Sequence, residues 1–152
     1  MKKHVIPSIL LIAYSALLVK ILVFKDLPVI KIGHMIFKMG GVTEGQANLV
    51  PFKTILLYLN HGGLVIGGIN ILGNIILLVP FGFLLPFVFQ KLSWKKSLIV
   101  AAIVPLIIEV LQTVLHRGIF DIDDVILNGL GVMIGYGIAT ILRGGEKEKV
   151  LL

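Results

Sequence analysis

The sequence predicts an all-α integral membrane protein, a bundle of about four transmembrane helices with a long outward loop. Of the 152 residues, 57% are hydrophobic and 14% are charged, whereas a soluble domain carries about 25% charged residues. The apolar residues also gather in runs that are long enough to cross a bilayer core of ~30 Å. Because no repeat or change of composition divides the chain, we expect a single domain over residues 1–152.

The first apolar run extends from Val5 to Phe24 and follows a basic start, Lys2 and Lys3. This arrangement fits either a signal peptide or a first membrane helix. No small-residue cleavage pattern follows the run, so we expect it to be retained as a membrane helix. Residues 70–89, 97–115 and 124–142 supply the other three expected spans, and Pro80 predicts a kink in the second of them.

Residues 25–69 form the longest segment without a clean span. Lysines alternate with apolar residues over 28–39, as in an element that lies at the membrane surface. The apolar piece 54–59 is too short to cross and ends at a glycine pair, Gly62-Gly63. A surface lid, a re-entrant segment and an irregular loop all remain open for this region.

The chain has a net charge of +6 and a pI of about 9.7. The basic residues flank the apolar runs and form no stripe with interleaved aromatic residues, so we expect membrane lipids and no nucleic acid as partners. More of them lie in the two termini and the loop 90–96 than beside the other helix ends. We therefore expect both termini in the cytoplasm, and the 25–69 loop and the 116–123 turn outside. The lack of cysteine excludes disulfides and thiolate chemistry.

Polar residues repeat at helical spacing inside three of the apolar runs. One charged group at the centre of a membrane helix costs roughly 2.5–3.5 kcal/mol or more, so such residues point to a site. The stripes are Asn70 and Asn74; Glu109, Gln112 and His116; and Asp121, Asp124 and Asn128. Under the expected topology all three lie in the outer half of the membrane. They predict a polar pocket that opens outward beneath the long loop.

Most of these residues also have a purely structural interpretation. Gly131 and Gly135 are spaced for close helix approach. Asp121 is suited to cap the last helix, and Asn74 or Asn128 could join helices through hydrogen bonds. Arg117 and His116 are typical of the membrane interface, where Arg117 could neutralise a carboxylate. Glu109 fits a structural role least well, because a buried carboxylate needs a partner.

Four carboxylates near the end of one bundle could hold Mg²⁺ or Ca²⁺ or carry out acid–base catalysis. However, the sequence contains no HExxH, GxSxG or Walker A pattern. We therefore predict neither a metal nor a cofactor, and we favour binding over catalysis.

Four blocks of the sequence resemble the VanZ-like family of bacterial membrane proteins. They are NLVPF at 48–52, GNIILLVPFGFLLP at 73–86, IEVLQ at 108–112 and RGIFDIDDVILNGLGVMIGY at 117–136. The resemblance implies a small helical bundle in the bacterial plasma membrane. Some members of the family are linked to low-level resistance to teicoplanin and related lipoglycopeptide antibiotics, although family membership alone does not transfer that property.

The residues and the resemblance together predict an envelope protein whose outward pocket binds a lipid-linked or cell-wall ligand, or a glycopeptide. The expected binding residues are Asn48, Asn74, Glu109, Gln112, Arg117, Asp121, Asp124 and Asn128. An intramembrane enzyme that acts on a lipid or envelope precursor is the alternative. A small transporter is a third possibility, which the lack of inverted symmetry and the one-sided polar stripes disfavour.

Overall fold

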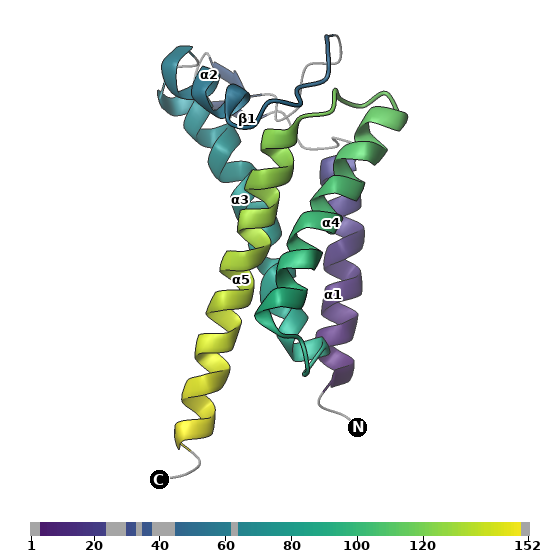
Figure 1. Cartoon of the computed structure of the whole chain (residues 1–152), viewed down its shortest axis with the longest axis vertical. Coiled ribbons are helices and arrows are strands. Elements are labelled where there is room, and N and C mark those ends of the chain that lie inside the picture. Colours follow the sequence, from purple (N-terminus) through teal and green to yellow (C-terminus); the bar gives the residue numbers. More distant parts are fainter. Residues whose placement is uncertain (1–3, 24–29, 33–34, 38–44, 62–63, 150–152) are drawn as a thin grey trace.

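Four long helices run side by side in the computed structural model, which describes residues 4–23, 30–32, 35–37, 45–61 and 64–149 (Figure 1). They are α1 (Val5–Leu18), which continues as the π-helical turn η2 (Val19–Val23), α3 (Leu64–Val88), α4 (Trp94–Val114) and α5 (Ile122–Lys149). All four contain a stretch long and apolar enough to cross a membrane. The predicted all-helical membrane bundle is therefore confirmed.

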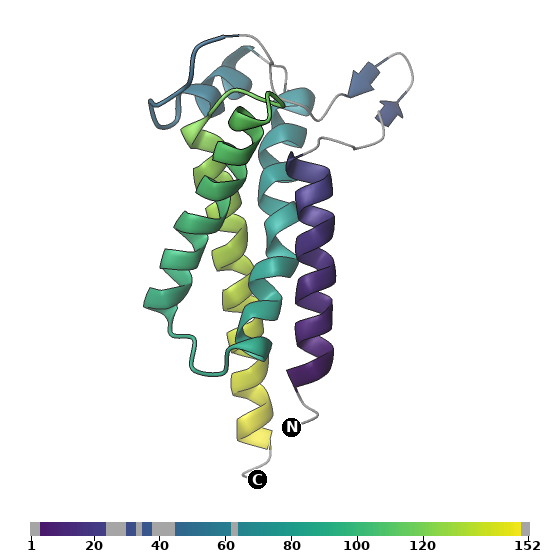
Figure 2. The same cartoon turned by 90° about the vertical axis from the view of Figure 1, so that its right-hand side faces the viewer.

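Two small elements lie at one end of this bundle, which we call the α2 end (Figures 1 and 2). The short helix α2 spans Lys53–His61, and the strands β1 (Ile30–Ile32) and β2 (Met35–Phe37) form an antiparallel hairpin in which Ile30 pairs with Phe37. The beginning of α1 and the end of α5 lie at the opposite end, which we call the terminal end. The sequence suggested a surface element over 28–39 but did not predict its strands.

The boundaries of two helices differ from those expected. Helix α5 continues to Lys149 instead of stopping near residue 142, because the polar tail is rich in Glu and Lys, which are good helix formers outside the membrane. Helix α3 begins at Leu64 rather than at Asn70 and continues through both Pro80 and Pro86. The kink expected at Pro80 stays a prediction.

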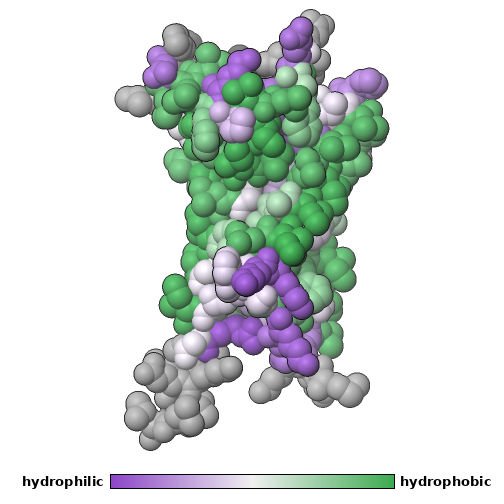
Figure 3. Space-filling model, in the orientation of Figure 1, coloured by the Kyte–Doolittle hydropathy of each residue, from purple (hydrophilic) through white to green (hydrophobic). Residues whose placement is uncertain are grey.

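The surface of the bundle matches a membrane environment. A broad apolar band crosses the middle of the molecule, and hydrophilic residues gather toward its two ends (Figure 3). Large apolar side chains on the outside of the helices are more than half exposed, including Ile12, Ile76 and Ile99. In water such a surface would be an aggregation liability, whereas in a bilayer it faces lipid.

Helices α3 and α5 pack so closely that their backbones touch. A Cβ atom added at Gly131 would overlap the carbonyl oxygen of Ile75, and one at Gly135 would overlap that of Val79. On the facing helix, a Cβ at Gly82 would overlap the carbonyl of Val132. Membrane helices gain stability from such approach because van der Waals packing replaces the hydrophobic effect. The predicted role of Gly131 and Gly135 in close helix packing is thus seen directly.

Replacing Gly135 with leucine should destabilise the bundle by about 3 kcal/mol, because the new side chain must push two backbones apart. The measurement is the unfolding free energy of the purified protein in detergent. Gly137→Leu is the matched control, since nothing lies within 4 Å of the position its Cβ would take. Equal stability of the two variants would contradict the observed packing.

Candidate functional site

The loop before α2 is joined to the loop before α5 by their backbones. The amide of Asn48 donates to the carbonyl of Phe120 at 2.8 Å, and the amide of Ile122 donates to the carbonyl of Asn48 at 3.0 Å. These two bonds form an isolated parallel bridge between Asn48 and Asp121. Asn48, a residue expected in the site, is thereby fixed beside the start of α5.

The Asp121 carboxylate lies at the centre of this junction. One of its oxygens accepts hydrogen bonds from the Asn48 amide group and from the Asp123 backbone N–H, both at 2.9 Å. The other oxygen accepts from the Thr54 hydroxyl at 2.6 Å. The bond from Asp123 N–H is the N-cap interaction that a helix start requires. Asp121 therefore caps α5 and also ties the α2 segment to it.

The Asp123 carboxylate anchors α2 from the neighbouring helix. Its side chain is completely buried and accepts hydrogen bonds from the backbone amides of Phe52, Thr54 and Ile55, the last two at 2.7 and 3.1 Å. Amides at a helix N-terminus have no partner within their own helix, and the helix dipole favours a negative charge there. Phe52 enters this turn with a positive φ of 68°.

Asp123 was not among the expected site residues. Helical spacing groups it with none of the three polar stripes, and its partners lie about 70 positions away in the sequence. The only available signal was a third aspartate beside two others.

The other two carboxylates meet groups from neighbouring helices. Glu109 is 1% exposed and accepts from the backbone N–H of Asp121 at 3.0 Å. The side-chain amide of Asn74 in α3 donates to Asp124 at 2.6 Å. One or two residues from each of the three stripes thus come together at the α2 end. We call the set Asn48, Thr54, Asn74, Glu109, Asp121, Asp123 and Asp124 the polar cluster.

Helix α2 adds an aromatic hydroxyl to the edge of the polar cluster. Burial and the negative charges of Asp124 and Asp121 raise the pKa of Tyr58 above its ordinary value. The phenol therefore stays neutral at physiological pH and retains its O–H as a donor. Helices α2 and α3 lie close together here, because a Cβ atom added at Gly67 would lie only 2.6 Å from the carbonyl oxygen of Tyr58.

Two of the expected site residues lie apart from the polar cluster. Gln112 is buried and donates to the carbonyl of Leu22 at 3.0 Å, which ties α4 to the end of the first span. Arg117 is exposed, and within the described part of the chain its guanidinium makes no ion pair with a carboxylate. The expectation that Arg117 neutralises Asp121, Asp123 or Glu109 finds no support in these contacts.

His116 has a structural role at the end of α4. Its φ is 54°, its amide donates to the carbonyl of Thr113, and the next amide, that of Arg117, donates to the carbonyl of Gln112. This pair of bonds is a Schellman motif, in which the residue with positive φ is usually glycine.

Asn128 lies one helical turn beyond Asp124 and deeper in the bundle. The residue is 3% exposed, and its side-chain carbonyl oxygen has no hydrogen-bond partner among the described residues. A buried acceptor without a donor costs about 1–3 kcal/mol. Asn128 is therefore the buried member of the expected site whose side-chain oxygen finds no donor within the described part of the chain.

The carboxylates of the polar cluster are directed at protein donors rather than at one another. Within the described residues, no three histidine or acidic side chains come together in an arrangement that would hold a metal ion. The contacts define a packed cluster covered by α2, and the ligand pocket expected from the sequence stays a prediction.

Asp123→Ala should release α2 from the bundle, since three backbone amides lose their common acceptor. The expected cost is about 3 kcal/mol, together with faster hydrogen exchange at residues 52–56, measured by mass spectrometry. Arg117→Gln is the control and should leave that exchange unchanged. Retained protection of α2 in the alanine variant would show that other contacts hold it.

Comparison with known proteins identifies the family of the chain. Neither the curated proteins nor the solved structures include a significant match. The model of the VanZ/LLP1 family, however, matches residues 11–143, which include the greater part of each of the four spans and the whole polar cluster. With most of its length matched, the chain belongs to the VanZ/LLP1 family of membrane proteins.

Proposed function

We propose that this VanZ/LLP1-family membrane protein binds a lipid-linked cell-wall ligand at its α2 end and thereby lowers susceptibility to teicoplanin-type lipoglycopeptides. The family and the four candidate spans are established by the matched sequence and the structure. The ligand, the resistance and the orientation in the membrane are the proposal.

The distribution of basic residues supports an outward α2 end. The terminal end carries Lys91, Lys95, Lys96 and Arg143. Positive residues in short loops and next to helix ends favour the cytoplasmic side. The polar cluster then lies in the outer leaflet, on the side where cell-wall precursors are used and lipoglycopeptides arrive.

The single observation that carries the proposal is the buried side-chain oxygen of Asn128, for which the described residues supply no hydrogen-bond donor. A buried acceptor one helical turn from Asp124 calls for a hydrogen-bond donor such as a hydroxyl or an amide N–H. Sugars and peptides of cell-wall precursors are rich in both groups, and so are glycopeptide antibiotics. We infer that such a donor reaches Asn128 when the ligand is bound.

The α2 helix provides a route for a ligand with a lipid tail. Leu56, Leu57 and Leu59 are all more than half exposed, so α2 presents apolar side chains next to the membrane. A lipid-linked ligand can approach through the bilayer along these residues and displace the short helix from above the polar cluster. The hydrogen bonds from α2 to Asp121 and Asp123 would be exchanged during this displacement.

Cysteine labelling tests the orientation. The chain has no cysteine, and both Gln46 near the α2 end and Ser93 at the terminal end are exposed. Single substitutions Gln46→Cys and Ser93→Cys should differ on intact cells: an impermeant maleimide should label the first and not the second. After cell lysis both should react, and the reverse pattern on intact cells would refute an outward α2 end.

Asn128→Leu tests the function while preserving the fold. Replacing an unpartnered polar group by an apolar one of similar size should keep or raise stability. Ligand affinity, however, should fall at least about tenfold, equivalent to about 1.4 kcal/mol. The measurement is teicoplanin susceptibility of cells that produce wild-type or variant protein at equal levels, and protection should drop to that of cells without the protein.

Ser97→Ala is the matched control for this experiment. The Ser97 hydroxyl is also buried and has no partner within the described residues, but it lies near the start of α4, at the terminal end. Its loss should leave protection intact. Full protection by Asn128→Leu would rule out Asn128 as a ligand contact, and loss of protection in both variants would point to a general effect on the bundle.

A further inference from the structure

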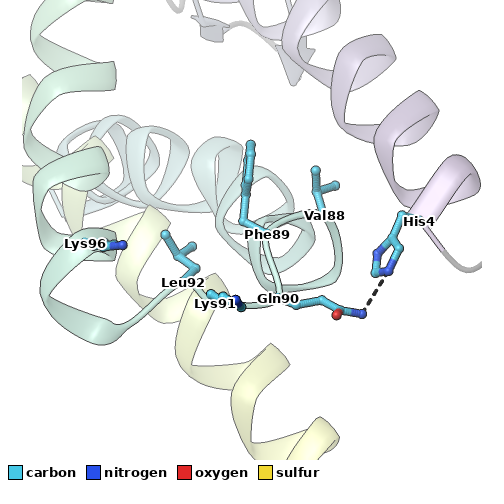
Figure 4. Close-up of a pocket in the computed structure, with 7 residues that line it drawn as sticks. All are labelled: His4, Val88, Phe89, Gln90, Lys91, Leu92 and Lys96. Atoms are coloured by element: carbon cyan, nitrogen blue, oxygen red, sulfur yellow. Dashed lines mark hydrogen bonds between the residues drawn. The ribbon is translucent and has the colours of Figure 1, made fainter. Parts of the chain in front are cut away.

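A hollow of about 450 Å³ opens at the terminal end, away from the polar cluster (Figure 4). It lies where the last turn of α3, the turn into α4 and the start of α1 come together. Its lining consists of His4, Lys96 and residues 88–92. None of these residues is acidic, so the hollow combines positive charge with apolar surface.

The two kinds of surface come from different residues of the hollow. Val88, Phe89 and Leu92 supply apolar side chains, and Phe89 is 54% exposed. Lys91 and Lys96 supply ammonium groups, and both residues are exposed. Within the described part of the chain, neither ammonium group is engaged by a hydrogen bond or an ion pair.

Hydrogen bonds hold the α1 side of the hollow in place. His4 Nδ1 lies 3.1 Å from the carbonyl oxygen of Phe87, and its Nε2 lies 2.9 Å from the amide nitrogen of Gln90 (Figure 4). The carbonyl can only accept, so Nδ1 carries the proton, and Nε2 accepts from Gln90. The start of α1 is thereby fixed to the end of α3.

Two further basic side chains at this end, Arg143 and Lys95, already have partners. Arg143 donates to the carbonyl of Pro86 and stacks on Phe87 with 5.7 Å from its guanidinium carbon to the ring centre. The Lys95 ammonium group lies 5.8 Å from the centre of the Trp94 ring, and Lys95 does not line the hollow. The charges left for a ligand within the hollow are therefore those of Lys91 and Lys96.

We propose that this hollow binds the headgroup of an anionic phospholipid. The phosphate would lie between the ammonium groups of Lys91 and Lys96, and the first carbons of the acyl chains would follow Phe89 and Leu92 into the bilayer. A lipid fits better than a soluble phosphate because the hollow lies at the ends of three candidate spans and three of its seven lining residues are apolar. Basic side chains at such a border attract anionic headgroups.

Lipid binding can be measured by native mass spectrometry of the full chain released from detergent, titrated with phosphatidylglycerol or with phosphatidylcholine. We expect the wild type to retain phosphatidylglycerol in preference to phosphatidylcholine. Lys96→Gln should weaken that binding about fivefold, as should Lys91→Gln. Lys95→Gln removes the same charge from the adjacent residue outside the hollow and should change the affinity less than twofold.

A second readout uses the single tryptophan of the chain, Trp94, which precedes both lysines of α4. Phosphatidylglycerol with brominated acyl chains should quench its fluorescence more than brominated phosphatidylcholine does, and Lys96→Gln should remove the difference. Equal binding of the two lipids by the wild type would overturn the proposal. So would equal losses in Lys95→Gln and Lys96→Gln, since they would show attraction to diffuse surface charge rather than a site.

Discussion

The buried carboxylate of Asp123 sets the arrangement of the α2 end. It has no access to water, and a buried charge without donors would cost several kcal/mol. The first amides of α2 supply the donors. The carboxylate and the amides each offset the free-energy cost of burying the other without a hydrogen-bond partner. The short helix α2 must therefore lie over the start of α5. Asp121 likewise accepts hydrogen bonds from the side chains of Asn48 and Thr54. The polar cluster is built around Asp121 and Asp123.

Much of this fold depends on sequence patterns within single helices, and those parts were predictable from the sequence. Apolar runs of sufficient length gave the four spans, helical spacing brought Asn74, Glu109 and Asp124 to the same end, and the spacing of Gly131 and Gly135 indicated close packing. Each of these signals depends on residues within a few turns of one helix, where periodicity fixes direction.

The parts that were missed depend on partners far apart in the chain or on backbone geometry. Asp123 finds its donors at the start of α2, some 70 residues earlier, and no spacing rule connects the two. Gln112 shares the helical spacing of Glu109, yet its side chain donates to Leu22 of η2, and Arg117, just beyond the end of α4, is exposed. His116 adopts a conformation that favours glycine, so its residue type gave no hint of its position. Local pattern identifies which helix face is polar, whereas tertiary contacts decide which of its members meet.

The close α3–α5 contact has a consequence for how the protein is made. During synthesis α3 leaves the ribosome before α4, and its glycine-matched partner comes last of the four spans. In the two-stage view, helices insert first and pair afterwards. Helix α3, with Asn74 still lacking Asp124, must therefore wait in the lipid or beside the insertion machinery until translation is nearly complete. A chain that ends before Ile122 would leave α3 in contact with α1 through the Tyr14–Leu77 hydrogen bond but without its glycine-matched partner and without Asp124 for Asn74.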